Sequence, residues 1–361
     1  MEYANSAALI NSRPFDFERN KGIRASSNGS RRRANETLEK YLIETWLPEI
    51  ETQVKPTTLE STKTIVRRHI VPALGCIPLD QLSREDLVAF YRELLHKPAA
   101  RRNHALSKTT VQRIHATLHW ALQDLVVVGG LDHNPAHNIR SKRRKSECHE
   151  IRIWSETELR RFLAFARSDY LFPLWRLLAW TGMRRGEALG VKWCDLRTRP
   201  DAVAIRRSVT IAGGQLHVTT PKSARARVIA LDATTARVLR SYRRRQDSLL
   251  VEERRPATRD DDWIFHTQRQ PMNPNRISKY FPRLVERSGL PKIRLHDLRH
   301  THASHLILVG ANIKAVQERL GHADIVLTLN IYSHLSQRRS GKLLHRSRAS
   351  MRSTLDSSGW S

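Results

Sequence analysis

The chain has 361 residues, and its 63 Lys and Arg against 35 Asp and Glu give a formal net charge of +28. This length predicts two domains, with three as the alternative. The charge favours a polyanionic partner over the surface of an ordinary enzyme, because basic residues also fall inside the predicted helices. No run of eighteen apolar residues occurs, which excludes a membrane-spanning helix, and we expect no signal peptide. The three cysteines (Cys76, Cys148 and Cys194) are too far apart for a disulfide framework or a Cys-x-x-Cys zinc pair, so we expect a cytoplasmic protein.

The first part of the chain is predicted to be a basic arm followed by a helical domain. Residues 1–34 lack periodicity and contain Arg31-Arg32-Arg33, which indicates a flexible arm. Residues 35–137 show four stretches of apolar residues at helical spacing. The first stretch includes Leu38. The other three are predicted to start at the capping boxes Thr57-x-x-Glu60 and Ser83-x-x-Asp86 and at Ser107. By itself this pattern predicts only an unspecific helical bundle.

A second domain is predicted after a basic linker. Residues 138–150 contain Lys-Arg-Arg-Lys without an apolar pattern and can lie along phosphates. Residues 151–340 form the second domain, which opens with the capping box Ser155-x-x-Glu158. Pro173 starts its next helix, and Gly182 ends it within Thr-Gly-Met-Arg-Arg-Gly-Glu. The tight turn at this glycine should project the side chain of Arg184.

Strand composition then predicts a small three-stranded sheet. Its strands are Ala202 to Thr210, Gln215 to Thr219 and Arg227 to Leu231, with a Gly-Gly turn between the first two. A charged helix from Ala233 to Arg259 and a short buried element at Asp262 to Phe265 follow. Residues 341–361 are predicted to be a basic tail.

The region from Leu295 to His334 carries polar residues at fixed intervals. A helix from Asp297 to Val309 would place His296 and Arg299 on one face, with Leu298, Leu306 and Val309 as an adjoining apolar stripe. A second helix is predicted to start at Asn312 and to end at Gly321. His322 therefore lies at a helix end, and Tyr332 follows ten residues later.

Taken together, these motifs resemble those of the tyrosine recombinases, the phage integrase family. The match consists of Arg184 in the first arginine motif, His296-x-x-Arg299, Leu-Gly-His at His322, and Tyr332. It covers roughly Glu36 to Leu335. It implies a mainly α fold with a small antiparallel sheet, in which a helical core-binding (SAM-like) domain and an α+β catalytic domain form a C-shaped DNA clamp. An additional arm-binding domain, which many integrases carry, is predicted to be missing or cut short.

The resemblance implies a site-specific DNA recombinase that works through a 3′-phosphotyrosyl intermediate, without metal, ATP or another cofactor. Tyr332 is the implied nucleophile, and Arg184 and Arg299 the implied partners of the non-bridging oxygens. Lys222 is the implied general acid, with Arg225 and Arg227 as alternative cations. His296 is the implied acid–base partner and His322 a hydrogen-bond donor to the phosphate. The partners would be double-stranded DNA attachment sites, three further copies of the chain in a homotetramer, and accessory DNA-bending or directionality factors. The place of action would be the cytoplasm, at the nucleoid.

Several other interpretations remain open. The nearest is a type IB topoisomerase, and a catalytically silent DNA-binding regulator is another. His296, His300, His302 and His305 have a spacing that metal ligands on one helix could have, but they lack the Glu of His-Glu-x-x-His. A metal-dependent nuclease would need clustered carboxylates, and the run Asp260 to Asp262 is interpreted as solvated. Tyr280, close to basic residues, is the rival nucleophile.

Overall fold

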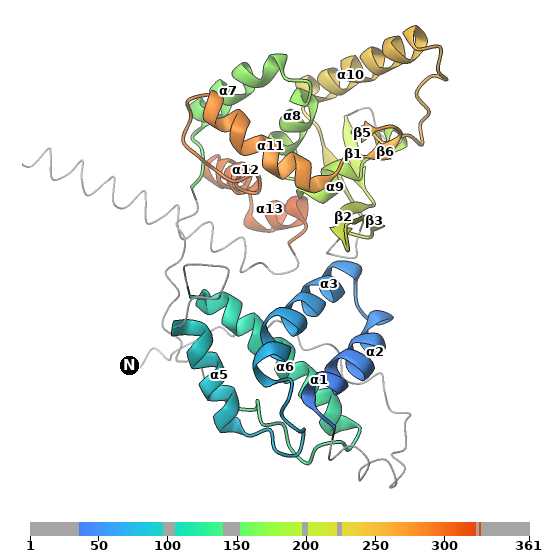
Figure 1. Cartoon of the computed structure of the whole chain (residues 1–361). Helices are drawn as coiled ribbons and strands as arrows, with labels where there is room; N and C mark the ends of the chain where they lie inside the picture. The colour runs from blue at the N-terminus through green and yellow to red at the C-terminus, as the bar shows by residue number, and fades with distance from the viewer. Residues whose placement is uncertain are drawn as a thin grey trace, which may run out of the picture. The chain divides into compact units, whose positions relative to one another are not determined.

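The computed structural model describes residues 36–96, 105–139, 152–196, 201–221, 226–322 and Ile325. The chain divides into two compact units, Met1–Ser146 and Glu147–Ser361, at a point inside the predicted linker (Figure 1). The described residues are mostly helical, with small antiparallel sheets, as predicted. No helix in these ranges is long and apolar enough to cross a membrane.

The N-terminal unit contains the four helical stretches that the sequence predicts. In chain order the segments are α1 (Leu38–Lys40), η2 (Tyr41–Trp46), α2 (Leu47–Glu51), α3 (Pro56–Ile65), η3 (Val66–Ile70), α4 (Val71–Leu74), α5 (Arg84–His96) and α6 (Lys108–Val127). The segments α1, η2 and α2 follow one another without a break, as do α3, η3 and α4, so each set is one predicted helix. The Ser83 and Ser107 caps are confirmed, since both hydroxyls accept a backbone N–H three residues on. The capping box at Thr57 is wrong, because Pro56 already begins the helix and Lys55 is its N-cap.

The core of the N-terminal unit joins its first helix to α6. Trp46 is fully buried and meets the ring of Trp120 edge-on, with 5.1 Å between the ring centroids. Its indole N–H donates to Asp124 of α6 over 2.8 Å, and the hydroxyl of Tyr41 donates to the carbonyl of Ala121 over 2.8 Å. Both polar aromatic tips therefore have a partner inside an apolar interface, as buried Tyr and Trp need.

The C-terminal unit holds the remaining elements. Its helices are α7 (Glu156–Phe165), η4 (Ala166–Ser168), α8 (Phe172–Thr181), α9 (Arg185–Leu189), η5 (Trp193–Leu196), α10 (Ala233–Glu252), α11 (Pro274–Arg287), α12 (Asp297–Leu308) and α13 (Ile313–Leu320). Its strands are β1 (Ala202–Ile205), β2 (Ser208–Ala212), β3 (Gln215–Thr219), β4 (Arg227–Ala230), β5 (His266–Thr267) and β6 (Gln270–Pro271).

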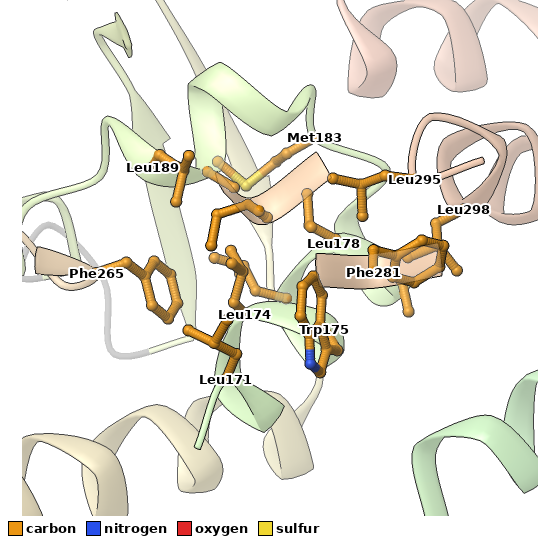
Figure 2. Packing of buried hydrophobic residues seen from close by; sticks show 14 of the residues in the cluster. Leu171, Leu174, Trp175, Leu178, Met183, Leu189, Phe265, Phe281, Leu295 and Leu298 are labelled. Carbon is orange, nitrogen blue, oxygen red and sulfur yellow. The ribbon is translucent and has the colours of Figure 1, made fainter. Parts of the chain in front are cut away.

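Helix α8 is the centre of this unit, since it contacts α7, α9, α10 and α12. Its residues Leu174, Trp175 and Leu178 lie within the apolar cluster of Figure 2, which also contains Phe281 of α11 and Leu298 of α12. The capping box of Ser155 and the placement of Pro173 in the first turn of α8 are both confirmed. A helix with apolar residues on most of its surface is stable only where neighbours cover it on several sides.

The predicted three-stranded sheet is wrong in its details. The first predicted strand is broken at Arg206 and Arg207, because both guanidiniums turn toward the buried carboxylate of Asp195, over 3.8 and 2.6 Å. Four strands result, and they form two antiparallel pairs, β1 with β4 and β2 with β3. The predicted Gly213-Gly214 turn joins β2 to β3, and both glycines have positive φ, 55° and 78°, as a tight hairpin turn requires.

Two further predictions need correction. Val309 is 80% exposed, so the apolar stripe of α12 does not reach the end of that helix. The charged helix α10 ends at Glu252, seven residues before the predicted end. By contrast, Ile264 and Phe265 are fully buried, as predicted for the short element that follows α10.

Candidate active site

Arg184 owes its position to the glycine that ends α8. Gly182 has φ 64°, and a Cβ on it would lie 2.6 Å from the side chain of Leu320 and 2.8 Å from that of His302. Only glycine therefore allows both this turn and the close approach of α12 and α13. Two residues later, Arg184 is the N-cap of α9, so its side chain leaves a rigid corner.

Glu187 is the acidic residue around which the site is built. Its side chain is 1% exposed. The carboxylate accepts hydrogen bonds from the backbone N–H and Nη1 of Arg184, over 2.9 and 2.8 Å, and from Nη1 and Nη2 of Arg227, over 3.2 and 2.7 Å. Burial alone would raise the pKa of Glu187, but the hydrogen bonds and charge of Arg227, together with Arg184, outweigh it and lower the pKa. Glu187 is therefore ionised and holds two guanidiniums.

Arg299 enters the site from the first turn of α12. It is 3% exposed, and its Nη1 and Nη2 donate to the carbonyls of Gly182 and Leu320 over 2.7 and 2.8 Å. Burial, followed by the positive charge of Arg184, lowers the pKa of Arg299 to about 9. The charged guanidinium is therefore disfavoured chiefly by its burial and secondly by Arg184, and a bound anion would favour it.

The end of α13 is held by three arginines from three different elements. Its last carbonyls belong to Arg319, Leu320 and Gly321, and they accept from Arg227 (3.0 Å), Arg299 (2.8 Å) and Arg184 (2.9 Å) respectively. The C-terminus of a helix has unsatisfied carbonyls and a partial negative charge, so cations are favourable there. We call these three side chains, with Glu187, the arginine cluster. It contains three guanidiniums and one carboxylate.

His322 and His296 lie beside the arginine cluster. As predicted, Asn312 caps α13 and Gly321 ends it with φ 66°. His322 is therefore the residue directly after Gly321, whose carbonyl accepts from Arg184. Burial, followed by the charges of Arg299 and Arg184, lowers the pKa of His322 to about 3. His296 immediately precedes α12; part of its surface is open to solvent, and its ring lies edge-on to that of His300, with 5.0 Å between the ring centroids. Desolvation, followed by His300 and Arg299, lowers its pKa to about 4. Both imidazoles are neutral at pH 7, and each can donate one N–H and accept one proton.

The structure thus brings together four of the six predicted site residues: Arg184, His296, Arg299 and His322. Lys222 and Tyr332 lie outside the described residues, as does Arg225. Arg227, the other alternative to Lys222, is described. All three of its nitrogens donate into the protein, to Glu187 and to the carbonyl of Arg319.

The geometry disfavours the zinc interpretation. His302 accepts a hydrogen bond from Arg319, and His305 bonds the carbonyl of Trp154, so both imidazoles are engaged away from His296. Within the described ranges, no group of three or more His, Cys, Asp or Glu side chains could hold a metal ion.

The acidic run from Asp260 to Asp262 is solvated at Asp261, whose side chain is 83% exposed, and partly covered at Asp260 and Asp262. Its three carboxylates lie 3.0, 2.7 and 3.6 Å from Arg243, Lys192 and Arg269. Each aspartate is therefore paired with a different cation, and the three do not converge on one point.

Tyr280 is a poor nucleophile in this structure. Its hydroxyl donates to Asp169 over 2.5 Å, and this hydrogen bond, with burial, raises the pKa of Tyr280 to about 12. Deprotonating this phenol would place a second negative charge beside the Asp169 carboxylate.

Glu187 was not identified from the sequence as part of the site, and Arg227 was considered only as an alternative cation to Lys222, not as a partner of Glu187. A signal for Glu187 was available, because a glutamate three residues after a helix start is the second half of a capping box. Here Arg184 occupies the N-cap position that Ser or Thr usually takes. No spacing in the sequence relates Arg227 to Glu187, which lies forty residues away.

Comparisons with known proteins identify the family of the chain. Residues 152–339 match the phage integrase family, and residues 37–95 match its N-terminal SAM-like domain. The chain belongs to the phage integrase family. This integrase is 27% identical over 297 residues to the ICEBs1 integrase of Bacillus subtilis (strain 168), covering 81% of the chain and 78% of that relative. It is 28% identical to the tyrosine recombinase XerD of Listeria monocytogenes serotype 4b (strain F2365), covering 74% and 83%.

Solved structures share the fold of this integrase. The Tn1549 transposon integrase in complex with transposon right end DNA has a TM-score of 0.67 at 21% identity, with 86% of this chain and 99% of that chain covered. A lambda integrase tetramer bound to a Holliday junction has a TM-score of 0.59 at 19% identity, with 86% and 82% covered. By its family and its named relatives, the protein is a tyrosine-type site-specific recombinase.

Proposed function

We propose that this recombinase breaks and rejoins DNA at the arginine cluster, with Tyr332 as the nucleophile. The observation that carries the proposal is the charge imbalance of the cluster: it contains three guanidiniums and one buried carboxylate. That carboxylate pairs with Arg184 and Arg227, whereas Arg299 donates only to backbone carbonyls. Such a site favours an anion, and planar guanidiniums suit the non-bridging oxygens of a phosphate. In this proposal Arg184 and Arg299 meet those oxygens, and His322 adds a hydrogen bond.

The chemical step keeps the energy of the broken bond in a covalent ester. The phenol oxygen of Tyr332 attacks the phosphorus, and its proton passes to His296. The bond to the 5′ oxygen breaks, and that oxygen leaves with a proton from Lys222. The negative phosphodiester offsets the arginine charges that disfavour an imidazolium at His296, so bound DNA would make this histidine a better base. Attack by a 5′ hydroxyl of another strand reverses the step and releases the tyrosine.

We extend the proposal to partners and place. The substrate is double-stranded DNA at attachment sites, and four copies of the chain act together during integration or excision of a mobile element. The DNA-bound neighbours, among them a tetramer on a Holliday junction, support this assembly. Accessory DNA-bending or directionality factors, and a cytoplasmic location at the nucleoid, belong to the same proposal. The proposal also keeps the predicted residue ranges of the basic arm (1–34), the linker (138–150) and the basic tail (341–361).

A nicked suicide substrate tests the nucleophile. After cleavage the short product strand diffuses away, so the covalent adduct accumulates and peptide mapping locates it. We expect the adduct at Tyr332 in buffer with excess EDTA, and none with Tyr332→Phe. Tyr170→Phe is the control, because Tyr170 is 58% exposed and keeps its ring.

An undiminished adduct with Tyr332→Phe would refute the nucleophile assignment. A need for added metal would support a nuclease instead. Relaxation of supercoiled DNA without recombinant junctions would favour the topoisomerase alternative, and specific DNA binding without any adduct would favour the silent regulator.

A further inference from the structure

We propose that Arg227 is a positioning residue for the recombination reaction: it holds Glu187 so that Arg184 faces the scissile phosphate. This role is separate from the proton donation that the sequence left open for Arg227. The proposal rests on the proposed function, in which Arg184 meets a non-bridging oxygen.

The contacts of Arg227 all point into the protein. Its side chain is 11% exposed, and it grips both oxygens of Glu187 while its Nε donates to the carbonyl of Arg319. Its guanidinium also packs under Gly321, where an added Cβ would lie 2.8 Å from Nη1. A guanidinium committed in this way, and strongly basic by nature, is poorly suited to hand a proton to a leaving oxygen.

The two arginines share the carboxylate oxygens of Glu187, and this sharing explains how Arg227 can act through Arg184. The guanidinium of Arg184 reaches only one carboxylate oxygen, through Nη1, while its Nη2 donates to the carbonyl of Gly321. Arg227 reaches both oxygens of the same carboxylate. If Arg227 were removed, Glu187 would be free to form a two-bond pair with Arg184, the geometry that Arg and carboxylate prefer. Arg184 would then have fewer N–H groups for phosphate.

Arg227 also links the two helices that carry the site, α9 and α13. It extends from β4, contacts α9 through Glu187, and contacts the end of α13 through Arg319. His322 follows Arg319 by three residues, so the side chain of Arg227 influences both the arginine and the histidine offered to the phosphate. A purely structural residue would stabilise the fold without such selectivity.

The test uses a substrate whose scissile phosphate is a methylphosphonate, which has no negative charge on its non-bridging atoms. On ordinary DNA, we expect Arg227→Ala to lower the single-turnover cleavage rate by about 10- to 100-fold, below the effect of losing a direct donor. DNA affinity should change by less than about threefold, as expected for a role confined to the transition state. On the methylphosphonate, the ratio of variant to parent rate should return to within about threefold of one, because Arg184 then has no charge to meet.

Controls make the outcome specific. Arg176→Ala removes an arginine of similar exposure (14%) that pairs with Asp232 over 2.8 Å between α8 and α10. Its variant should show no dependence on the charge of the phosphate. Arg227→Lys keeps the charge but cannot form the two-bond fork, so it should retain most of the defect. Arg227→Lys also replaces Arg227→Ala in the test if the alanine variant does not fold.

Three outcomes would overturn the inference. An equal defect of Arg227→Ala on both substrates would make Arg227 a structural residue only. Rescue by a 5′-phosphorothiolate, but not by the methylphosphonate, would make it the proton donor. An unimpaired rate would remove any role.

Arg184→Ala separates this inference from the proposed function. If the methylphosphonate rescues Arg184→Ala but not Arg227→Ala, only the positioning role fails. If it rescues neither, the assignment of Arg184 to the non-bridging charge fails as well.

Discussion

Replacing Glu187 by glutamine tests whether one carboxylate holds the site together. The change keeps the size of the side chain but removes its charge, and the new amide N–H₂ group faces guanidinium donors. Glu187 accepts four hydrogen bonds from two arginines while 1% exposed. Breaking a buried ion pair from one side costs about 3–5 kcal/mol, because the partner charge is left uncompensated.

That loss should appear in only one of the two compact units. For a unit of this size, it corresponds to a fall in the melting temperature of roughly 6–20 °C. We expect calorimetry to show the transition of the C-terminal unit moving by this amount, with the N-terminal transition in place. Glu156→Gln is the control, since its pair with Arg160 is 70% and 73% exposed and is worth at most about 1 kcal/mol.

The pH dependence gives a second, independent reading. The pKa of Glu187 in the folded protein lies below its usual value of 4.5. A group with a lowered folded pKa contributes stability that is fully present above its unfolded pKa and is lost as the pH falls through the folded value. The stability difference between the parent and Glu187→Gln should therefore be constant above about pH 5 and shrink as the pH falls below 4.5. A variant within 1 kcal/mol of the parent at pH 7, with unchanged cleavage, would refute this reasoning.

Two further predictions concern Lys222 and Gly321. Lys222→Ala should cleave ordinary DNA about 10²- to 10⁴-fold more slowly and recover on a 5′-phosphorothiolate, whose sulfur leaves without a proton; no recovery in single-turnover assays would reject Lys222 as the acid. Gly321→Ala should lower stability, because alanine is strained at a φ of 66°, and it should slow cleavage, because the added Cβ would displace Arg227. Gly310→Ala is the control: its φ is 85° and nothing lies within 4 Å, so it should lower stability through the backbone strain alone. Equal cleavage rates for the two glycine variants would count against the contact with Arg227.

The parts of the fold that the sequence predicted well are those decided by local chemistry. Ser107, Ser155 and Asn312 each cap a helix through their own side chain. Gly182 and Gly321 each end one in the left-handed region. These residues act on backbone within four positions, so their effect can be predicted without the tertiary structure.

The predictions that were wrong or missing depend on distant partners. The break between β1 and β2 comes from Asp195, which draws Arg206 and Arg207 away from the ladder. Helix α11 was not predicted and contains Pro282 in its interior, a residue that normally argues against a helix. Burial of Phe281 and Leu284 compensates for it.

The same distinction applies to the site. The motif residues Arg184, His296, Arg299 and His322 could be selected by type and spacing. The pairing of Arg227 with Glu187 could not be predicted in this way, because it depends on how β4 packs against α9.

Trp154, near the start of the C-terminal unit, is bonded to α12 and to the segment that precedes it, and this affects how the protein is made. The backbone N–H of Trp154 donates to Thr301, its indole N–H donates to the carbonyl of Pro291, and its carbonyl is bonded by His305. A ribosome adds about 5–20 residues per second, so Trp154 waits roughly 7–30 s for these partners to be synthesised. During that time the apolar face of α7, with Phe162, has no cover from Phe281. The nascent chain is thus expected to need chaperone protection in this interval. The arginine cluster, which bonds the carbonyls at the end of α13, cannot form until that helix has also been synthesised.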